Sequence, residues 1–250
     1  MKVSATSYLH ASHLIGKWAC ERASRYVCLA TVNQVMEAYD SAHFQSVMNN
    51  ADLVTPDGMP LVWASRLLGR KSTSRVYGPD LMAVLLGMAA ARALPIGFYG
   101  AAPRVLDQLI RVITDSFPAL KIAYACSPPF RPFGASEDQQ IVDRINSSGA
   151  TILFVGLGSP KQDCWMAAHR DSIQAVMVGV GAAFDFLAGA KPQAPRWMMP
   201  LGLEWLFRLV TEPRRLWKRY LKHNPRFVAL FALQLLRWKC FSSVSLHARS

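Results

Sequence analysis

The amino-acid sequence predicts an α/β protein: a Rossmann-like, mostly parallel sheet with helices on both faces, followed by a C-terminal helical and basic appendage. Two observations lead to this fold class. Short, near-continuous apolar runs alternate with longer amphipathic stretches as far as about residue 190, which is the pattern of strands buried on both faces and of the helices that cover them. Beyond that point the strand pattern stops, and prolines and positive charges accumulate.

Six strands are expected where apolar runs are rich in β-branched and aromatic residues, at residues 26–32, 52–55, 95–100, 120–125, 151–156 and 175–179. The stretches between them have apolar residues at helical spacing and predict helices near residues 34–49, 59–69, 79–93, 103–116, 137–148 and 160–171. Asp80, which follows a proline, and Ser136, which precedes an acidic pair, favour helix starts.

Two further helices are expected near residues 202–222 and 226–240, with no strand pattern around them. Residues 196–250 hold 11 Lys and Arg against two Asp and Glu, a net charge of +9, whereas residues 1–195 carry only +3. We therefore divide the chain into an α/β domain, residues 1–195, and a helical appendage, residues 196–250. Because the appendage interleaves basic residues with tryptophans, we expect it to meet an anionic membrane surface. A solvated charged face is the plainer alternative.

The composition is typical of a cytoplasmic protein that does not cross a membrane. Apolar residues make up 52% of the chain and charged residues 18%, which argues against disorder. Five cysteines show neither a CxxC pair nor metal-ligand spacing, so reduced thiols are expected. The amino-terminal residues lack the apolar core of a signal peptide, and no run approaches the roughly 20 apolar residues that a membrane-spanning helix needs.

Two glycine-rich segments follow successive strands. Gly156 and Gly158 close one strand and precede Gln162 at a helix start, and Gly179 and Gly181 repeat the arrangement one strand later. Such turns allow backbone N–H groups to approach a phosphate, so the pair predicts a nucleotide cleft. Tight strand-to-helix turns are the alternative. Neither segment matches a dinucleotide fingerprint or a P-loop.

Several polar side chains lie close to strand ends. Asp185 can bond a ribose or a base, and Thr31 and Asn33 suit sugar hydroxyls, but all three are also common helix caps. Arg75 can pair with a phosphate or with a structural carboxylate. Asp57 interrupts an apolar run, where it is either a turn residue or a working group at the carboxyl end of a strand. The sequence has no histidine cluster or Asp-x-Asp pair, so no metal site is predicted.

Taken together and in order, these motifs resemble the WecG/TagA/CpsF family of bacterial glycosyltransferases (glycosyltransferase family 26). The motifs that carry the resemblance are Thr31-x-Asn33, Thr55-Pro56-Asp57-Gly58, Arg75-x-x-Gly78-x-Asp80, Gly97-x-x-Gly100, Gly156-x-Gly158-x-Pro160-x-Gln162, Gly179-x-Gly181-x-x-x-Asp185 and the run from Gly202 to Pro213. The family usually has Arg-Ala-Pro where this chain has Gln193-Ala194-Pro195.

The resemblance implies an inverting, metal-independent glycosyltransferase without a cofactor. Such an enzyme moves a sugar from a UDP-sugar to a polyprenyl (undecaprenyl) diphosphate-linked sugar in cell-surface polysaccharide or exopolysaccharide biosynthesis. It is expected to associate peripherally with the inner face of the plasma membrane. By this resemblance Asp57 is the catalytic base, Thr31 and Asn33 line the pocket, and Gln162 and Asp185 bind the donor.

Chemistry gives these residues consistent roles. A sugar hydroxyl is a poor nucleophile at neutral pH, so a carboxylate such as Asp57 has to take its proton during the reaction. The leaving UDP develops negative charge, which cations must neutralise in the absence of a metal ion. Arg75 and three arginines of the appendage, Arg208, Arg214 and Arg215, are available for that purpose.

Two other classes of function are weighed against this one. A nucleotide-binding oxidoreductase on a Rossmann-type sheet is disfavoured because the dinucleotide fingerprint is broken. A basic nucleic-acid-binding module is disfavoured because the positive charge is confined to the tryptophan-rich, lipid-compatible appendage and because no known binding signature is present, so no nucleic-acid partner is expected. The transferred sugar, the acceptor sugar and the oligomeric state stay open, with a homo-oligomer among the alternatives.

Overall fold

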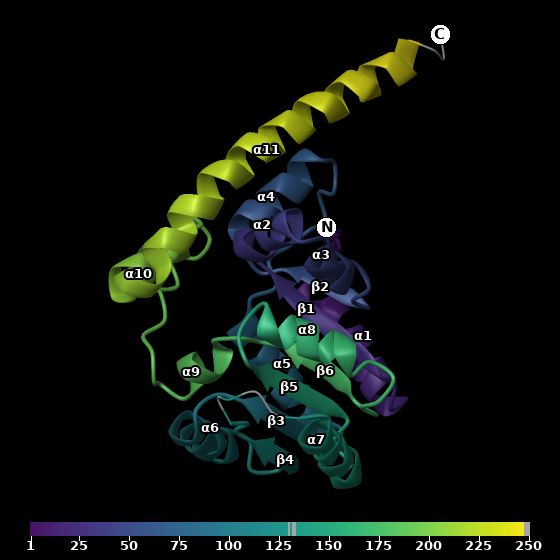
Figure 1. Ribbon diagram of the computed structural model, residues 1–250, viewed down its shortest axis with the longest axis vertical. Helices are drawn as coiled ribbons and strands as arrows, with labels where there is room; N and C mark the ends of the chain where they lie inside the picture. The colour runs from purple at the N-terminus through teal and green to yellow at the C-terminus, as the bar shows by residue number, and fades with distance from the viewer. Residues whose placement is uncertain (130, 132–133, 248–250) are drawn as a thin grey trace.

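The computed structural model describes residues 1–129, 131 and 134–247, with backbone alone from residue 239 onward. Within these residues the six expected strands form one sheet in the order β2-β1-β6-β5-β3-β4, and every neighbouring pair is parallel (Figure 1). The strands are β1 (Arg25–Ala30), β2 (Leu53–Pro56), β3 (Ile96–Gly100), β4 (Ile122–Cys126), β5 (Ile152–Gly156) and β6 (Val176–Gly179). The predicted fold class is therefore confirmed.

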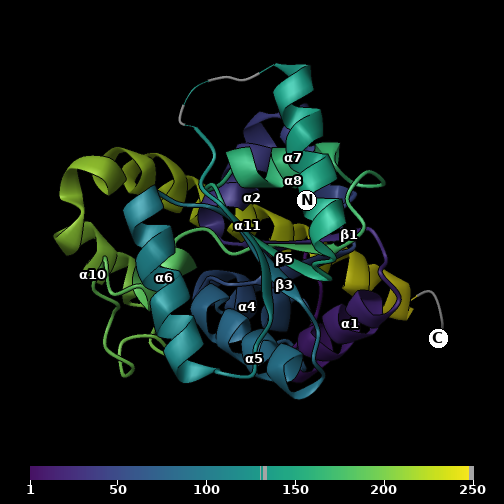
Figure 2. The same cartoon turned by 90° about the horizontal axis from the view of Figure 1, so that it is seen from below.

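Both faces of the sheet are buried, which explains why its strands are apolar throughout. Successive side chains of a strand face opposite sides: in β5, Ile152 and Phe154 belong to one core cluster and Leu153 and Val155 to the other. The first face is covered by α1 (Tyr8–Cys20), α5 (Gly78–Ala91), α6 (Pro103–Ser116) and α9 (Ala183–Leu187), and the second by α2 (Val32–Asp40), α3 (Ala42–Asn49), α7 (Ala135–Ser148) and α8 (Lys161–Ala168). Figure 2 shows α1 and α5 on one side of β3 and β5, with α7 and α8 on the other.

Three helical features differ from the expectation. No element was expected at α1, although its buried residues Ala11, Ile15 and Ala19 recur every four residues. The single helix expected at 34–49 is two helices, because Ser41 ends α2 and caps α3, its hydroxyl accepting a hydrogen bond from the Phe44 N–H at 3.2 Å. The short helix α9 was also not expected.

The appendage is helical, as predicted, but its two helices, α10 (Glu204–Thr211) and α11 (Pro213–His247), are divided elsewhere. The expected boundary near residue 225 is wrong: α11 begins at Pro213 and continues through Pro225. Proline suits the first position of a helix, where its missing N–H is not needed. Inside a helix proline lowers the stability of the helix. Contacts of α11 with the rest of the protein must offset this loss.

Those contacts dock α11 on α2 (Figure 1). Asp40 at the end of α2 accepts two hydrogen bonds from the Arg226 guanidinium and lies 3.4 Å from the Lys222 Nζ. Hydrogen bonding from Arg226 holds the pKa of Asp40 well below its usual range. Leu216 and His223 are buried against the body. In the described part of the chain, no helix combines the length and apolar character needed to span a bilayer.

Candidate active site

A cavity of about 610 Å³ lies where the appendage crosses the carboxyl ends of the strands. Because β1 lies between β2 and β6 in the sheet, the segments that follow these three strands meet at one edge. This is the edge at which open α/β sheets bind ligands. The remaining walls are formed by α4 (Met59–Leu67), α10 and α11.

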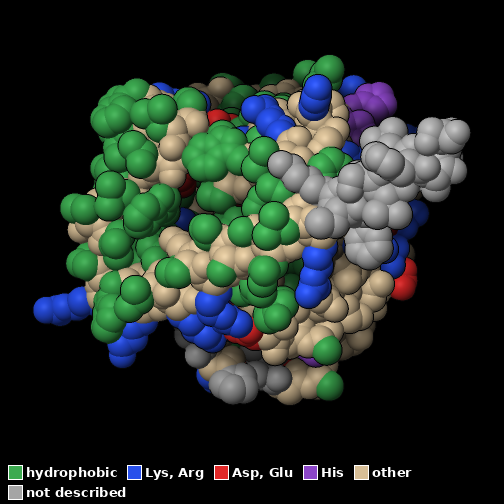
Figure 3. Space-filling model, turned by 90° about the horizontal axis from the view of Figure 1, so that it is seen from above, with side chains coloured by type: hydrophobic (Ala, Val, Ile, Leu, Met, Phe, Trp, Pro, Cys, Tyr) green, Lys and Arg blue, Asp and Glu red, His purple; other side chains and the backbone are tan. Residues whose placement is uncertain are grey.

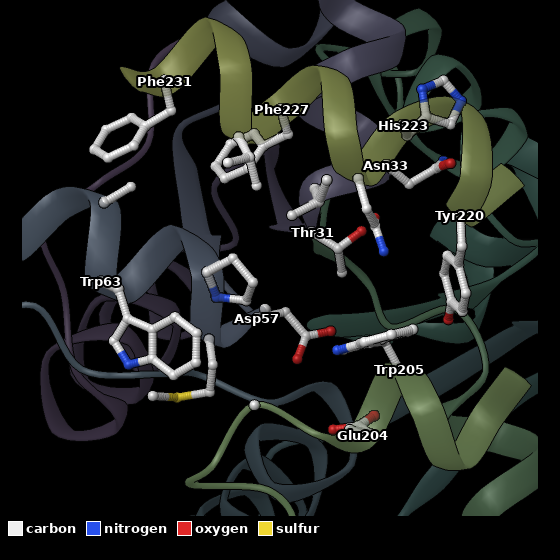
Figure 4. Close-up of a pocket in the computed structure, with 18 of the residues that line it drawn as sticks. Thr31, Asn33, Asp57, Trp63, Glu204, Trp205, Tyr220, His223, Phe227 and Phe231 are labelled. Carbon is white, nitrogen blue, oxygen red and sulfur yellow. The ribbon is translucent and has the colours of Figure 1, made fainter. Parts of the chain in front are cut away.

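Asp57 lies at the centre of this cavity (Figure 4). It directly follows β2, and its backbone N–H donates to the Ala30 carbonyl at 2.8 Å, which ties the segment to the end of β1. Gly58 then begins α4 as its N-cap. Turn geometry thus explains the local sequence, and it also points the carboxylate into the cavity.

Arg75 holds two carboxylates of the cavity together. The Val76 N–H donates to the Pro56 carbonyl at 2.9 Å, and this contact places Arg75 beside the end of β2. The Arg75 guanidinium donates to the backbone carbonyl of Asp57, lies 3.5 Å from Asp57 Oδ1, and donates to Oε2 of Glu204 from α10. It also lies 4.3 Å from the centre of the Tyr77 ring. Arg75 therefore joins the α/β domain to the appendage at the site.

Burial raises the pKa of Asp57 to about 7, against the opposing effects of Arg75 and Arg208, while Glu204 adds to the increase. The side chain is only 20% exposed, so water solvates its charge poorly. A carboxylate that titrates near neutral pH can accept a proton and release it again within the physiological range. The electrostatics of the site therefore suit Asp57 to general-base chemistry.

This pKa predicts the pH dependence of any reaction in which Asp57 is the base. Only the ionised carboxylate accepts a proton, so kcat/KM should rise with pH, with an inflection near pH 7, and should fall about tenfold per pH unit well below it. A pH–rate profile of the wild-type protein, compared with that of Asp57→Asn, checks this. An inflection of the same size and position in the variant would assign the titration to another group.

Thr31 and Asn33 both line the cavity, in the first turn of α2 and not in the strand that was expected to include residues 31 and 32. Thr31 is the N-cap, and its backbone N–H donates to Gln34 Oε1 at 3.1 Å. Asn33 Nδ2 donates to Glu37 Oε1 at 2.9 Å, whereas Asn33 Oδ1 is buried without a hydrogen-bond partner in the described residues. Thr31 therefore both caps α2 and lines the cavity, and Asn33 lines the cavity beside it.

The two glycine-rich turns are connected by Gln162. Gly158 and Gly181 adopt positive φ angles of +78° and +54°, which favour glycine. Gln162 Oε1 accepts hydrogen bonds from both their N–H groups, at 3.2 and 3.1 Å. Gly156 ends β5, and Gly179 ends β6 beside the Gln162 side chain. Gln162 itself is only 2% exposed, so the geometry gives it the role of a crosslink between the turns.

If the two glycine-rich turns hold the nucleotide, replacing Gln162 with Ala should loosen both turns and weaken UDP binding, because two partly buried N–H groups lose their acceptor, at a cost of up to about 1–3 kcal/mol each. We expect an increase of about tenfold or more in the Kd for UDP, measured by titration calorimetry. Gln139→Ala, a change of the same residue type on the exposed surface of α7, is the matched control. Equal UDP affinities of the two variants would place the nucleotide elsewhere.

The remaining sequence candidates divide between the cavity and the surface. Arg208 lines the cavity, with its guanidinium 5.7 Å from the centre of the Phe186 ring. Arg214 and Arg215 are exposed and are not among the lining residues, and Arg215 forms an ion pair with Glu212 at 2.7 Å. Asp185 is also outside the lining and pairs with Lys191 at 3.2 Å. The turn that follows Gly181 does reach the cavity, through Ala182.

Sequence reasoning missed most of the residues that the appendage contributes to this cavity. From α11, Arg219, Tyr220, His223, Asn224 and Phe227 line it. Their spacing of three and four residues marks one face of a helix, a signal that the basic pattern of the segment obscured. Glu204 and Trp205 also line the cavity; both lie within a motif that was noted, but Glu204 was given no role and Trp205 was expected on the apolar side of the appendage that meets lipid.

Four buried polar atoms of the lining have no hydrogen-bond partner in the described part of the chain. They are Asn33 Oδ1, Arg208 Nε, Arg219 Nε and His223 Nδ1. Burial lowers the pKa of His223, which favours its neutral form. Unpartnered buried polar groups are costly, and their concentration around one cavity indicates a polar ligand with acceptor and donor groups. Among the described residues, no group of three or more His, Cys, Asp or Glu side chains could hold a metal ion.

Comparisons with known protein sequences point to one family. A model of the glycosyl transferase WecG/TagA/CpsF family matches residues 1–240. The N-acetylglucosaminyldiphosphoundecaprenol N-acetyl-beta-D-mannosaminyltransferase of Bacillus spizizenii is 32% identical over 218 residues, which cover 87% of this chain and 82% of the relative. The protein of the same name from Bacillus subtilis strain 168 is 32% identical over 213 residues, covering 84% and 78%.

Proposed function

The chain belongs to the WecG/TagA/CpsF family of glycosyltransferases, and from this membership we propose that it transfers a sugar from a UDP-sugar to a polyprenyl-diphosphate-linked sugar, with inversion and without a metal ion. The names of both relatives specify transfer of N-acetylmannosamine to an N-acetylglucosaminyl diphosphoundecaprenol. An N-acetylhexosamine is therefore the first donor sugar to test. The oxidoreductase and nucleic-acid-binding alternatives gain no support from the comparisons.

The observation that carries the proposal is the position of Asp57 at the centre of a cavity lined by polar side chains with unused hydrogen-bonding atoms. In the proposed reaction Asp57 removes the proton from an acceptor hydroxyl, whose oxygen forms a bond to the anomeric carbon as the bond to UDP breaks. Displacement in one step inverts the configuration at that carbon. The second carboxylate, Glu204, is held in a close ion pair by Arg75, which favours Asp57 as the base.

Stabilisation of the leaving UDP is assigned to arginines of the appendage. Arg208 and Arg219 line the cavity, and neither forms an ion pair with another described residue. Their guanidinium groups are therefore available to a diphosphate, for which paired N–H donors are well suited. Preorganised cations of this kind stabilise the charge that develops in the transition state.

We also propose that the appendage brings the enzyme to an anionic membrane at the cytoplasmic face, where the acceptor is anchored. Its exposed apolar side chains include Trp197, Leu201, Val210, Trp217 and Leu221. Figure 3 views the molecule from above and shows hydrophobic side chains gathered on one side of that surface, with Lys and Arg side chains beside them. Apolar groups that enter the interface and basic groups that attract anionic lipid act together in peripheral binding.

The proposal is tested with purified protein, a panel of UDP-sugars and a soluble acceptor in which N-acetylglucosamine is linked through a diphosphate to a short isoprenoid. We expect UDP release and a glycosylated product with one of the N-acetylhexosamine donors. Transfer should persist in excess EDTA, because in this proposal arginines, and not a metal ion, stabilise the charge of the leaving UDP. Failure with every donor would refute the proposed function. Loss of activity in EDTA that Mg²⁺ or Mn²⁺ restores would refute metal independence alone.

A further inference from the structure

The cavity around Asp57 has two halves of opposite chemistry. On one side are Tyr220 and His223 with the polar groups already described, and on the other are Trp63, Phe227 and Phe231 (Figure 4). Asp57 lies between the two sides. A sugar and a diphosphate account for the polar half, but they leave the apolar half without an occupant.

The apolar half is an extended groove between two helices, which we call the α4–α11 groove. Its walls are Trp63 and Leu67 of α4 and Phe227, Phe231 and Leu235 of α11. On each helix these residues are four positions apart and so form one row along its surface. The rings of Phe227 and Phe231 are parallel within 7°, with centroids 6.0 Å apart. Trp63 and Leu67 remain 43% and 56% exposed, so the groove is open to a ligand.

The appendage also holds Trp63 in place. Gly202, at φ +68°, lies so close to the indole that a Cβ there would be 2.5 Å from Trp63 Cη2. The absence of a side chain at this position allows the loop before α10 to pack on the ring. The loop before α10 thus supports Trp63 in the α4 wall of the groove.

Resting on the proposed function, we infer that the α4–α11 groove binds the first isoprene units of the acceptor's polyprenyl chain. The groove and the chamber of Asp57 are parts of one continuous cavity. An unrelated membrane lipid bound in the groove would also occupy the chamber of Asp57. The polyprenyl chain of the acceptor, in contrast, carries the acceptor's own sugar into that chamber. An acceptor that joins a sugar to a hydrocarbon through a diphosphate matches the sequence of polar, cationic and apolar walls.

The length of the groove sets how much of the chain it takes. From His223 to Leu235, α11 advances about 18 Å at 1.5 Å per residue. This distance accommodates the beginning of a polyprenyl chain, and the remainder continues into the membrane. Affinity for soluble acceptors should therefore increase with each of the first isoprene units and then level off.

The experiment uses the full-length protein without vesicles or detergent, with acceptors that carry one, two or three isoprene units. Because each buried CH₂ group strengthens binding by up to about fourfold, we expect KM to fall at least about tenfold from the shortest to the longest acceptor, with little change in kcat. Calorimetry with the corresponding isoprenyl diphosphates, which lack a sugar, should show the same dependence of Kd on chain length.

Two leucines on α11 provide matched variants. Leu235 lines the groove, whereas Leu233 is 54% exposed and is not among the lining residues. Leu235→Ser should raise KM for the longest acceptor about tenfold and leave the shortest acceptor unaffected, while Leu233→Ser should behave as wild type. Transfer that does not depend on chain length, or equal effects of the two substitutions, would overturn the inference and leave the proposed function intact. Chain-length-dependent binding of isoprenyl diphosphates without transfer to any acceptor would support the groove and refute the function.

Discussion

Asp57→Asn is expected to lower turnover by roughly 10²–10⁴-fold, the usual contribution of a positioned general base, while UDP still binds. The amide is close in size to the carboxylate but cannot accept the proton of the acceptor hydroxyl. The substitution also weakens the contact with Arg75. The guanidinium lies 3.5 Å from Asp57 Oδ1 and is attracted by the carboxylate charge, which the amide lacks. Turnover with a soluble acceptor and UDP affinity by calorimetry are the two measurements. Near-normal turnover in the folded variant would leave Asp57 as a turn residue.

The stability of Asp57→Asn serves as the control, because the sign of its change is fixed by the pKa. Burial raises the pKa of Asp57 to about 7 in the folded protein, above its value of about 4 in the unfolded chain. The folded state therefore binds the proton more tightly, and this contribution to stability is present below about pH 4 and is lost as the pH rises to 7. At pH 8 the neutral Asn should be as stable as Asp57 or more so. A variant that melts at a lower temperature than wild type at pH 8 would show that the loss of activity has a structural cause.

The second large effect is expected for Arg208→Gln, which should reduce kcat by about 10²–10³-fold, as removal of one preorganised donor to a developing charge typically does. Arg208 lines the cavity, its Nε is buried without a hydrogen-bond partner in the described residues, and it forms no ion pair with them that would compete with a diphosphate. The reduction should appear mainly in kcat, since the charge on the leaving group increases in the transition state.

Arg214→Gln is the matched control, because Arg214 belongs to the same basic segment but is exposed and is not among the lining residues. With a soluble acceptor it should retain nearly full activity. If both substitutions reduce kcat equally in the absence of membranes, the clamp cannot be assigned to Arg208 from its position in the cavity. If neither does, leaving-group stabilisation belongs to other residues, and Arg219 becomes the next candidate to replace.

The parallel sheet could be predicted because strands that are buried on both faces must be apolar at nearly every position, as in Ile152, Leu153, Phe154 and Val155. Helix boundaries were less predictable. Ser41 divides α2 from α3 through a hydrogen bond to the backbone, whereas Pro225 fails to divide α11. The sequence shows a break-prone residue in both cases, but only packing decides whether the break occurs.

Part of the candidate site followed from the chain itself. Thr31 and Asp57 follow β1 and β2, and the carboxyl ends of adjacent parallel strands lie at one edge of the sheet. The resemblance had implied one pocket for both side chains, whereas the adjacency of β1 and β2 is a finding of the structure. The excess of positive charge in residues 196–250 likewise indicated an anionic ligand for the appendage.

Only the tertiary structure decided which appendage residues reach the cavity. The docking of α11 on α2 through Asp40 and Arg226 turns Arg219 and His223 inward and leaves Arg214 exposed, a distinction that a run of basic residues does not contain. Glu204 of α10, which Arg75 holds at the site, likewise comes near Asp57 only in the folded chain, and together with burial it raises the pKa of Asp57 to about 7. Local sequence determines strands, turns and net charge because these depend on neighbouring residues, whereas desolvation and ion pairing depend on groups that are distant in the chain and meet only when it folds.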